Sequence, residues 1–351
     1  MSKIIRSAFI LINVLLACFT LFSYISPSID PDSTYVFSFF GLLYPFLLVL
    51  NFIFIATWLF TKKRYALISL ITILLGYGHM DSFIGFNKDG VSADKTTIEI
   101  ISYNLQSVNR LQNQNGNFKE DVKKGFISQM KEQGLPTIFC TQETTYKGYT
   151  LIKEALGYPH MHKDVHGGTV ILSKVPFLGT GVVNLKSDEA SSAIWADIPF
   201  KNDTIRVYCI HLRSNKISKP ASKMLLGGQL QSTKTWNSVR GILANYKNST
   251  IIRVNQARTI VEHAKMSPYK TIICGDLNDT PLSHVYDVIT KDKKDSFKEA
   301  ETGIGTTYAG MIPALRIDYI LADERLDIIN HQIHKGNYSD HYPISAQIVL
   351  P

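Results

Sequence analysis

The sequence contains few cysteines and no metal-binding cysteine pattern. Only four cysteines occur in 351 residues, and no Cys-x-x-Cys or Cys/His spacing typical of zinc is present. Cys140, Cys209 and Cys274 each lie in an apolar, strand-like run, and Cys18 lies in a longer apolar run. We therefore expect unpaired thiols that pack as small apolar side chains, not a disulfide framework or a zinc site. Internal repeats and low-complexity tracts are also missing.

Charge is absent from two long stretches near the N-terminus. Residues 7–28 and 35–60 contain no charged side chain and are rich in Ile, Leu, Val and Phe. About 20 apolar residues suffice for a helix to cross the hydrocarbon core of a bilayer. With a third, shorter apolar run, these stretches predict a membrane anchor over residues 1–84. Its three transmembrane helices are expected at about 7–28, 35–60 and 65–83, followed by a linker at 85–94.

The basic residues around these stretches predict an orientation. Lys3 and Arg6 precede the first stretch, three consecutive basic residues at 62–64 follow the second, and the loop at 26–34 contains two Asp but no Lys or Arg. The positive-inside rule places the N-terminus and the 62–64 loop in the cytoplasm. An integral membrane protein is therefore expected. Its catalytic part is extracytoplasmic, at a periplasmic or outer face, if the third segment spans, and cytoplasmic otherwise.

From residue 95 onward, short apolar runs alternate with polar loops and a few helical patterns. Helices are expected near 119–133 and 255–264. Strands are expected at 97–103, 137–141, 168–173, 193–198, 204–211, 271–274, 317–321 and 344–349. Many strands with few helices indicate an α+β protein built as a four-layer α/β sandwich, in which two packed mixed β-sheets are flanked by helices. The domain is expected to cover residues 95–351.

Short polar motifs stand at the ends of several of these strands. They read Ser102-Tyr103-Asn104, Thr141-Gln142-Glu143-Thr144, Ile210-His211-Leu212, Gly275-Asp276-Leu277-Asn278, Arg316-Ile317-Asp318-Tyr319 and Ser339-Asp340-His341. Any one of them alone is equally consistent with a turn or a cap. Together they supply the carboxylates, amides and imidazoles that a divalent metal and an attacking water require. The set predicts a metal-dependent phosphoester hydrolase.

In their order and spacing the motifs resemble the endonuclease/exonuclease/phosphatase superfamily, which has the DNase I-like fold. The resemblance covers residues 95–351 and includes the strand Gly168-Thr169-Val170-Ile171-Leu172-Ser173-Lys174. It implies a catalytic Mg²⁺ or Mn²⁺, with the number of ions left open, held by Asn104 and Glu143 with help from Asp340.

The same resemblance implies catalytic roles for the remaining motif residues. His211 contacts the scissile phosphate, Asp276 and Asn278 are functional, and Asp318 pairs with His341 at the phosphate. The general base is either Asp276 or the Asp318–His341 pair, and the sequence leaves that choice open.

Acidic residues are missing between 213 and 258, where nine Lys or Arg residues occur. Because this stretch begins two residues after His211, it predicts an electrostatic collar for a polyanionic substrate or for lipid headgroups. Arg213, Lys216 and Arg240 are the expected substrate-binding residues. The alternative is a solvated surface helix and loop. Residues 95–351 carry +7 of the formal net charge of +8, which also suits an anionic partner.

These patterns predict a membrane-anchored phosphodiesterase or endonuclease that acts by metal-assisted, in-line attack of water. Gln106 and His211 differ from the abasic-site repair branch, which has an acidic residue and a Tyr at these places. The alternatives are a phospholipid or sugar-phosphate phosphoesterase, similar to sphingomyelinases or inositol phosphatases, and a non-catalytic membrane receptor module. The expected partners are a phosphate ester, as nucleic acid or lipid headgroup, and the bilayer itself; no protein partner is evident.

Overall fold

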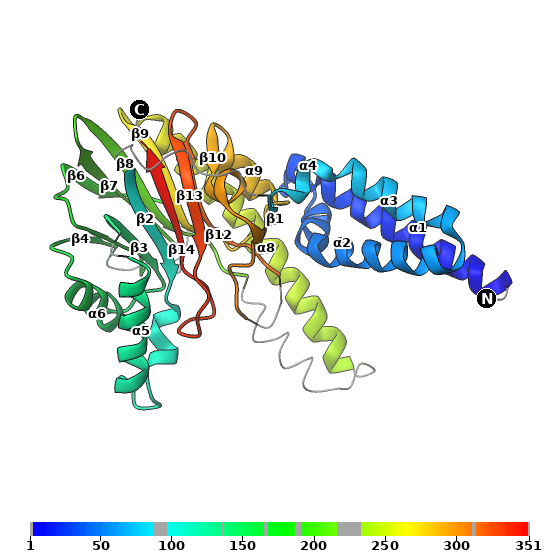
Figure 1. Cartoon of the computed structure of the whole chain (residues 1–351), viewed down its shortest axis with the longest axis horizontal. Coiled ribbons are helices and arrows are strands. Elements are labelled where there is room, and N and C mark those ends of the chain that lie inside the picture. Colours follow the sequence, from blue (N-terminus) through cyan, green and yellow to red (C-terminus); the bar gives the residue numbers. More distant parts are fainter. Residues whose placement is uncertain are drawn as a thin grey trace.

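The structure is a computed structural model that describes residues 3–86, 97–134, 136–164, 168–186, 191–215, 233–310 and 314–349. An N-terminal helical region extends from one side of a larger α/β domain (Figure 1). The helical region comprises α1 (Lys3–Ile25), η1 (Ser26–Ser28), α2 (Val36–Thr61), η2 (Lys63–Tyr65), α3 (Ala66–Leu75) and α4 (Tyr77–Met80).

Two of these helices, α1 with η1 and α2, are long and apolar enough to cross a membrane. Only 28% and 33% of their most apolar windows are buried, so most of these apolar side chains face outward. Several polar side chains inside the bundle are paired. Asn13, for example, donates to Ser69 Oγ at 2.7 Å and accepts from Trp58 Nε1 at 2.9 Å. Such pairing is what an apolar surrounding demands.

The predicted third helix at 65–83 is not one continuous element. α3 has only 10 residues and ends at Gly76, and α4 adds four more. The segment nevertheless runs back along α2. The Tyr65 ring lies 5.0 Å from that of Trp58 at one end, and His79 stacks on Tyr24 at 5.2 Å at the other. The chain therefore returns to the side on which the α/β domain lies.

The α/β domain contains two six-stranded sheets. The first has the order β10 (Lys293–Asp295), β12 (Asp318–Asp323), β9 (Lys270–Asp276), β8 (Asp203–His211), β7 (Ser192–Phe200) and β6 (Gly179–Val182). The second has the order β13 (Asp327–Ile333), β14 (Ile344–Val349), β2 (Thr97–Asn104), β3 (Ile138–Gln142), β5 (Val170–Ser173) and β4 (His160–Lys163). The pairs β8–β9 and β2–β3 are parallel and the other pairs are antiparallel, so both sheets are mixed.

The sheets pack face to face and helices cover their outer faces. The main core cluster joins apolar residues of both sheets. Helices α5 (Glu120–Glu132) and α6 (Tyr146–Leu156) pack on the second sheet, and α8 (Thr233–Lys265) and α9 (His284–Thr290) pack on the first. The predicted four-layer sandwich of two mixed sheets is confirmed. The helix expected at 255–264 is only the end of the 33-residue α8.

Three of the four cysteines lie in this core. Cys140, Cys209 and Cys274 are buried and unpaired, as predicted, whereas Cys18 is exposed on α1. Burial raises the pKa of the Cys140 thiol, which keeps it protonated and unreactive.

The helical region and the α/β domain are joined by several polar contacts. Strand β1 (Ile84–Gly85) pairs with β11 (Gly303–Ile304), which follows the short helix α10 (Ser296–Ala300). The buried Arg316 donates from Nε to Ser82 O at 2.8 Å. Arg258 on α8 forms ion pairs with Asp30 and Asp32, in the loop between α1 and α2. The two parts therefore meet through ion pairs and strand pairing.

Candidate active site

Strand register brings three of the motif residues side by side. In the first sheet, His211 at the end of β8 is the register partner of Asp276 at the end of β9, and Asp276 is the partner of Asp318 at the start of β12. Asn104 ends β2 in the other sheet, and its Nδ2 donates to Asp276 Oδ2 at 3.0 Å. Residues far apart in the sequence therefore meet where the two sheets end together.

Two further motif residues have left-handed backbone conformations. Glu143, which follows β3, has φ 48°, and Asn278 has φ 53°. Such conformations are unfavourable for residues other than glycine and often occur at functional sites. Asn278 is held in place because its N–H donates to Asp276 Oδ1 at 2.7 Å. Glu143 Oε1 lies 3.3 Å from Asn104 Nδ2, and its side chain is 36% exposed.

Gly275 allows β8 and β9 to approach each other at this point. Its φ is 143°, and a Cβ added there would lie 1.9 Å from Ile210 O. Any side chain would push the two strands apart and would move His211 and Asp276 with them. The glycine of this motif is therefore required by the backbone.

A hydrogen-bonded pair forms the next part of the site. Asp318 Oδ2 lies 2.9 Å from His341 Nδ1, which fixes the imidazole ring. Ser339 Oγ donates to Asn104 O at 2.7 Å and so fixes the loop that carries His341. Thr307 Oγ1 accepts the N–H groups of both Ile317 and Asp318, at 3.0 and 3.1 Å. Thr307 lies outside every motif, and no sequence signal marked it.

Burial and neighbouring charges shift the pKa values of the titratable groups of the site in different directions. Burial, aided by the Asp318 carboxylate, raises the pKa of Asp276 to about 7. Burial alone lowers the pKa of His341, but the Asp318 and Asp276 carboxylates outweigh it and raise this pKa to about 10. Burial lowers the pKa of His211 and keeps that ring neutral. The two histidines therefore differ in charge at neutral pH.

The Nε2 atom of His211 is buried and has no hydrogen-bond partner within the part of the chain that the structure describes. It lies 3.5 Å from Glu143 Oε1 and 3.9 Å from Asp276 Oδ2. A buried polar atom without a partner is costly in free energy. This atom therefore points to a polar group that the site is built to receive.

The site also gathers donors that suit a divalent metal. Asp276, Asp318 and His341 each place one ligand atom within 4.8 Å of the others, which makes them a possible metal site. Of the residues predicted to bind metal, Asn104 and Glu143 lie next to each other. Asp340 accepts from Gln106 Nε2 at 2.7 Å, and burial raises its pKa. Carboxylate and amide oxygens are the ligands that Mg²⁺ and Mn²⁺ prefer.

The predicted basic collar is wrong for two of its nine members. Arg253 is fully buried, because it forms an ion pair with Asp279 at 2.8 Å, and Arg258 pairs with the helical region. Both are bound by acidic residues that lie outside the stretch in the sequence. Of the expected substrate-binding residues, Arg213 is partly buried beside the site and Arg240 is exposed on α8, whereas Lys216 lies outside the described residues.

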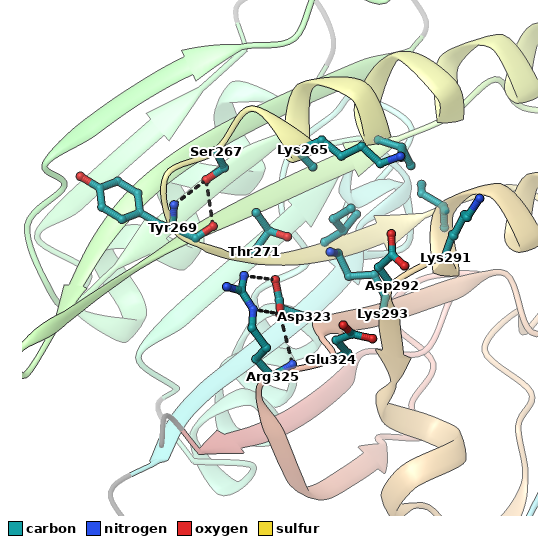
Figure 2. A pocket seen from close by; sticks show the side chains of 14 residues that line it. Lys265, Ser267, Tyr269, Thr271, Lys291, Asp292, Lys293, Asp323, Glu324 and Arg325 are labelled. Carbon is teal, nitrogen blue, oxygen red and sulfur yellow. Dashed lines mark hydrogen bonds and ion pairs between the residues drawn. The ribbon is translucent and has the colours of Figure 1, made fainter.

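A pocket of about 230 Å³ lies at the opposite end of the same strands. Figure 2 shows its lining, which includes Thr271 near the start of β9 and Asp323 at the end of β12. Both signs of charge line it, since Lys265 and Lys293 stand near Glu324. None of the motif residues contributes to this pocket, so it is separate from the candidate active site.

The geometry matches a known sequence family. The sequence model of the Endonuclease/Exonuclease/phosphatase family matches residues 101–341. The chain belongs to the endonuclease/exonuclease/phosphatase family. As a member of this family, whose enzymes typically depend on divalent metals, it is a hydrolase of phosphoric esters. Residues 6–83 match a domain of unknown function (DUF8431).

Solved structures of this family share the fold at low sequence identity. The Bacteroides vulgatus endonuclease/exonuclease/phosphatase is 17% identical, with a TM-score of 0.55, over 73% of this chain and 100% of that one. D. rerio TDP2 in complex with a single-strand DNA product is 17% identical, with a TM-score of 0.53, over 73% and 100%. A Bacteroides thetaiotaomicron mannosyl-6-phosphatase is 15% identical, with a TM-score of 0.51, over 72% and 100%. No curated protein sequence matches the chain significantly.

Proposed function

We propose that this protein is a membrane-anchored, divalent-metal-dependent phosphodiesterase. The observation that carries the proposal is the buried Nε2 of His211, which lies near Glu143 and Asp276 and has no hydrogen-bond partner among the described residues. A phosphoryl oxygen placed there accepts the hydrogen bond that Nε2 lacks, beside the carboxylates that a metal requires. The similar structures include one with a DNA product and one named for a sugar phosphate, so the fold alone does not choose the ester.

Glu143 and Asn104 are the proposed metal ligands, with Asp340 contributing nearby. The Glu143 side chain is 36% exposed, whereas Asp276 and Asp318 are 1% and 2% exposed and already hydrogen-bonded. Mg²⁺ usually retains several of its waters, which favours the accessible ligand. When bound, the metal acts as a Lewis acid on the phosphate.

The remaining side chains bind and orient the reactants. Asp276 receives hydrogen bonds from Asn104 and Asn278, which leaves its carboxylate fixed to orient the attacking water. His341, held by Asp318, and His211 donate to phosphoryl oxygens that gain charge in the transition state. The water oxygen forms a bond to phosphorus, the ester P–O bond breaks, and a proton goes to the leaving oxygen.

The helical region is the proposed membrane anchor, in which α1 and α2 cross the membrane and the segment of α3 and α4 crosses back toward the α/β domain. The basic residues 62–64 follow the far end of α2, and the acidic loop before α2 contacts the α/β domain. The positive-inside rule then places the α/β domain outside the cytoplasm. We retain the division into an anchor at 1–84, a linker at 85–94 and a catalytic domain at 95–351.

The test is hydrolysis of bis(p-nitrophenyl) phosphate by the full-length protein in detergent. The full chain is needed because a truncation at residue 95 removes the Ser82 acceptor of Arg316 and strand β1. Activity should require Mg²⁺ and disappear in EDTA, and His341→Ala should lower kcat by at least about a hundredfold.

The metal assignment has its own variant and control. Glu143→Gln should raise the Mg²⁺ concentration for half-maximal activity by at least about tenfold, since it removes a charged ligand. Glu154→Gln, which changes an exposed carboxylate on α6 in the same way, is the matched control and should behave as the wild type. An unchanged metal requirement in Glu143→Gln would contradict the assignment and favour the Asp276, Asp318 and His341 cluster.

A further inference from the structure

The loop that follows the catalytic Asn278 rests directly on α2. Thr280 Oγ1 donates to Gly41 O at 3.3 Å, and a Cβ added to Gly41 would lie 2.1 Å from Leu282 O. Leu282 is buried in one cluster with Tyr44 of the same helix. One motif of the active site is therefore anchored on the second turn of a proposed transmembrane helix.

A second motif is connected to the same turn of α2 through a small apolar cluster that contains Tyr308. The Tyr308 ring meets His341 edge-on, with ring centroids 5.2 Å apart. Tyr308 packs with Leu315 and Ile317 in a small apolar cluster against Leu42 of α2. This cluster therefore connects the His341 loop to the second turn of α2.

The helices already expose apolar side chains at the end nearest the α/β domain, on both sides of the contact at Gly41 along α2. Ile25 at the end of α1 and Val36 at the start of α2 are 44% and 48% exposed, and Leu43, beside the contact, is 45% exposed. Gly41 lies about 7.5 Å along the helix from Val36. The contact with the catalytic loops therefore lies within the length of α2 that exposes apolar side chains.

The length of α2 sets the depth of that contact. Its 26 residues extend about 39 Å, whereas the hydrocarbon core is about 30 Å thick. When the basic residues that follow Thr61 are placed at one membrane surface, about six residues at the other end of α2 extend beyond the hydrocarbon core. These are Val36 to Gly41, so the catalytic loops lie at the level of the lipid headgroups.

Helix α8 continues this surface. Tyr246 donates to Ser38 O at 2.9 Å, and Lys247 lies over the Tyr35 ring at 4.7 Å, so α8 crosses the first turn of α2. From there the N-terminal end of α8 extends away from the sheets, on the side of the α/β domain where the helical region lies (Figure 1). Arg240 is exposed there, Leu243 is 43% exposed, and α8 has no acidic residue before Glu262. Basic and apolar side chains in this position suit an anionic bilayer surface.

We propose that the phosphoester cleaved by this site belongs to a phospholipid of the bilayer that holds α1 and α2. This inference rests on the proposed function and names its substrate class. An active site at headgroup level meets lipid phosphodiesters directly, whereas the negative surface potential of the bilayer repels a nucleic acid polyanion. One water is consumed per ester: its oxygen joins phosphorus and one proton goes to the leaving oxygen.

The test uses the full-length protein reconstituted with Mg²⁺ in vesicles of phosphatidylethanolamine and phosphatidylglycerol. Products are identified by mass spectrometry, and bis(p-nitrophenyl) phosphate, plasmid DNA and the water-soluble deacylated headgroup diesters are assayed in parallel. Vesicle lipid should be cleaved at least about tenfold faster than the deacylated diester at equal bulk concentration, because the anchor raises the local concentration of lipid at the site.

Two charge-introducing variants, one within α8 and one just after it, test the role of this helix surface. Leu243→Glu should lower lipid cleavage about fivefold to tenfold and leave bis(p-nitrophenyl) phosphate hydrolysis unchanged. Met266→Glu, at the residue that follows the C-terminal end of α8 and is 74% exposed, is the control and should alter neither rate. Lipid cleavage at the wild-type rate in Leu243→Glu would overturn the role of α8.

The outcomes separate this inference from the proposed function. A protein that cleaves the soluble diester or plasmid DNA while vesicle lipid stays intact overturns the inference and leaves the phosphodiesterase in place. Equal rates on vesicle lipid and deacylated diester overturn it as well, because the anchor then brings no advantage. Inactivity on every substrate removes the proposed function and the inference together.

Discussion

Two bidentate arginine–aspartate ion pairs predict very different effects of removing one charge. Arg316 binds Asp295 through two hydrogen bonds of 3.1 and 2.7 Å, and Arg325 binds Asp323 through two of 2.7 and 2.8 Å. Both carboxylates are at most 10% exposed. The arginines differ, since the side chain of Arg316 is 2% exposed and that of Arg325 is 62% exposed.

The burial of the arginine sets the magnitude. Asp295→Asn leaves the Arg316 charge buried without a counter-charge, which typically costs about 3–5 kcal/mol. At about 2–4 °C per kcal/mol for a domain of this size, the melting temperature should fall by about 10 °C. The hydrogen bond from Arg325 lowers the pKa of Asp323 to about 2, but solvent screens that pair. Asp323→Asn should therefore cost about 1 kcal/mol or less.

The assay is thermal unfolding of full-length protein in one detergent, followed by near-ultraviolet circular dichroism. Wild type, Asp295→Asn and Asp323→Asn are compared at neutral pH, where both carboxylates are charged. The difference between the two variants is the informative quantity, because both remove one negative charge from a bidentate pair. Equal, small shifts in melting temperature would refute the reasoning that burial of the arginine decides the cost.

Two further predictions concern positioning and pH. Thr307→Val should lower kcat about tenfold with little change in KM, because the backbone N–H of Asp318 then loses its hydrogen bond to Thr307. Thr307→Ser, which keeps the hydroxyl group, should have the wild-type kcat. A low kcat in Thr307→Ser would contradict this positioning role. Burial lowers the pKa of His331 to about 3, so the unfolded chain binds a proton below about pH 6.5 that the folded protein excludes. The free energy of unfolding should therefore fall as pH decreases from 6.5 toward 3, by up to about 1.4 kcal/mol per pH unit, and urea titrations of His331→Gln should show a smaller slope.

The strands of the sandwich were predictable because their signal is local. Apolar runs that end in polar motifs mark β2, β3, β8 and β9, and parallel neighbours bring such ends together. The pairing of Asp318 with His341 followed from the family resemblance, and the structure places the two within 2.9 Å. Thr307 was not predictable, because it binds Asp318 through a backbone N–H group that leaves no mark on the sequence.

Other errors arose where a residue's partner lies far away in the chain. The basic stretch at 213–258 looked like one charged surface, yet Arg253 is buried against Asp279 and Arg258 is bound to the loop before α2. Composition records the charge or apolarity of a segment and not the partner it meets.

The sequence by itself determined the two long apolar helices, the strand-end motifs and the chemistry those motifs supply, because hydropathy and residue type act over neighbouring positions. Only the tertiary structure decided that the site lies against α2. That placement depends on Thr280 and Tyr308 meeting Gly41 and Leu42 more than 200 positions earlier. Contacts over such separations arise from packing of the whole chain, and this packing is the basis for proposing a lipid substrate.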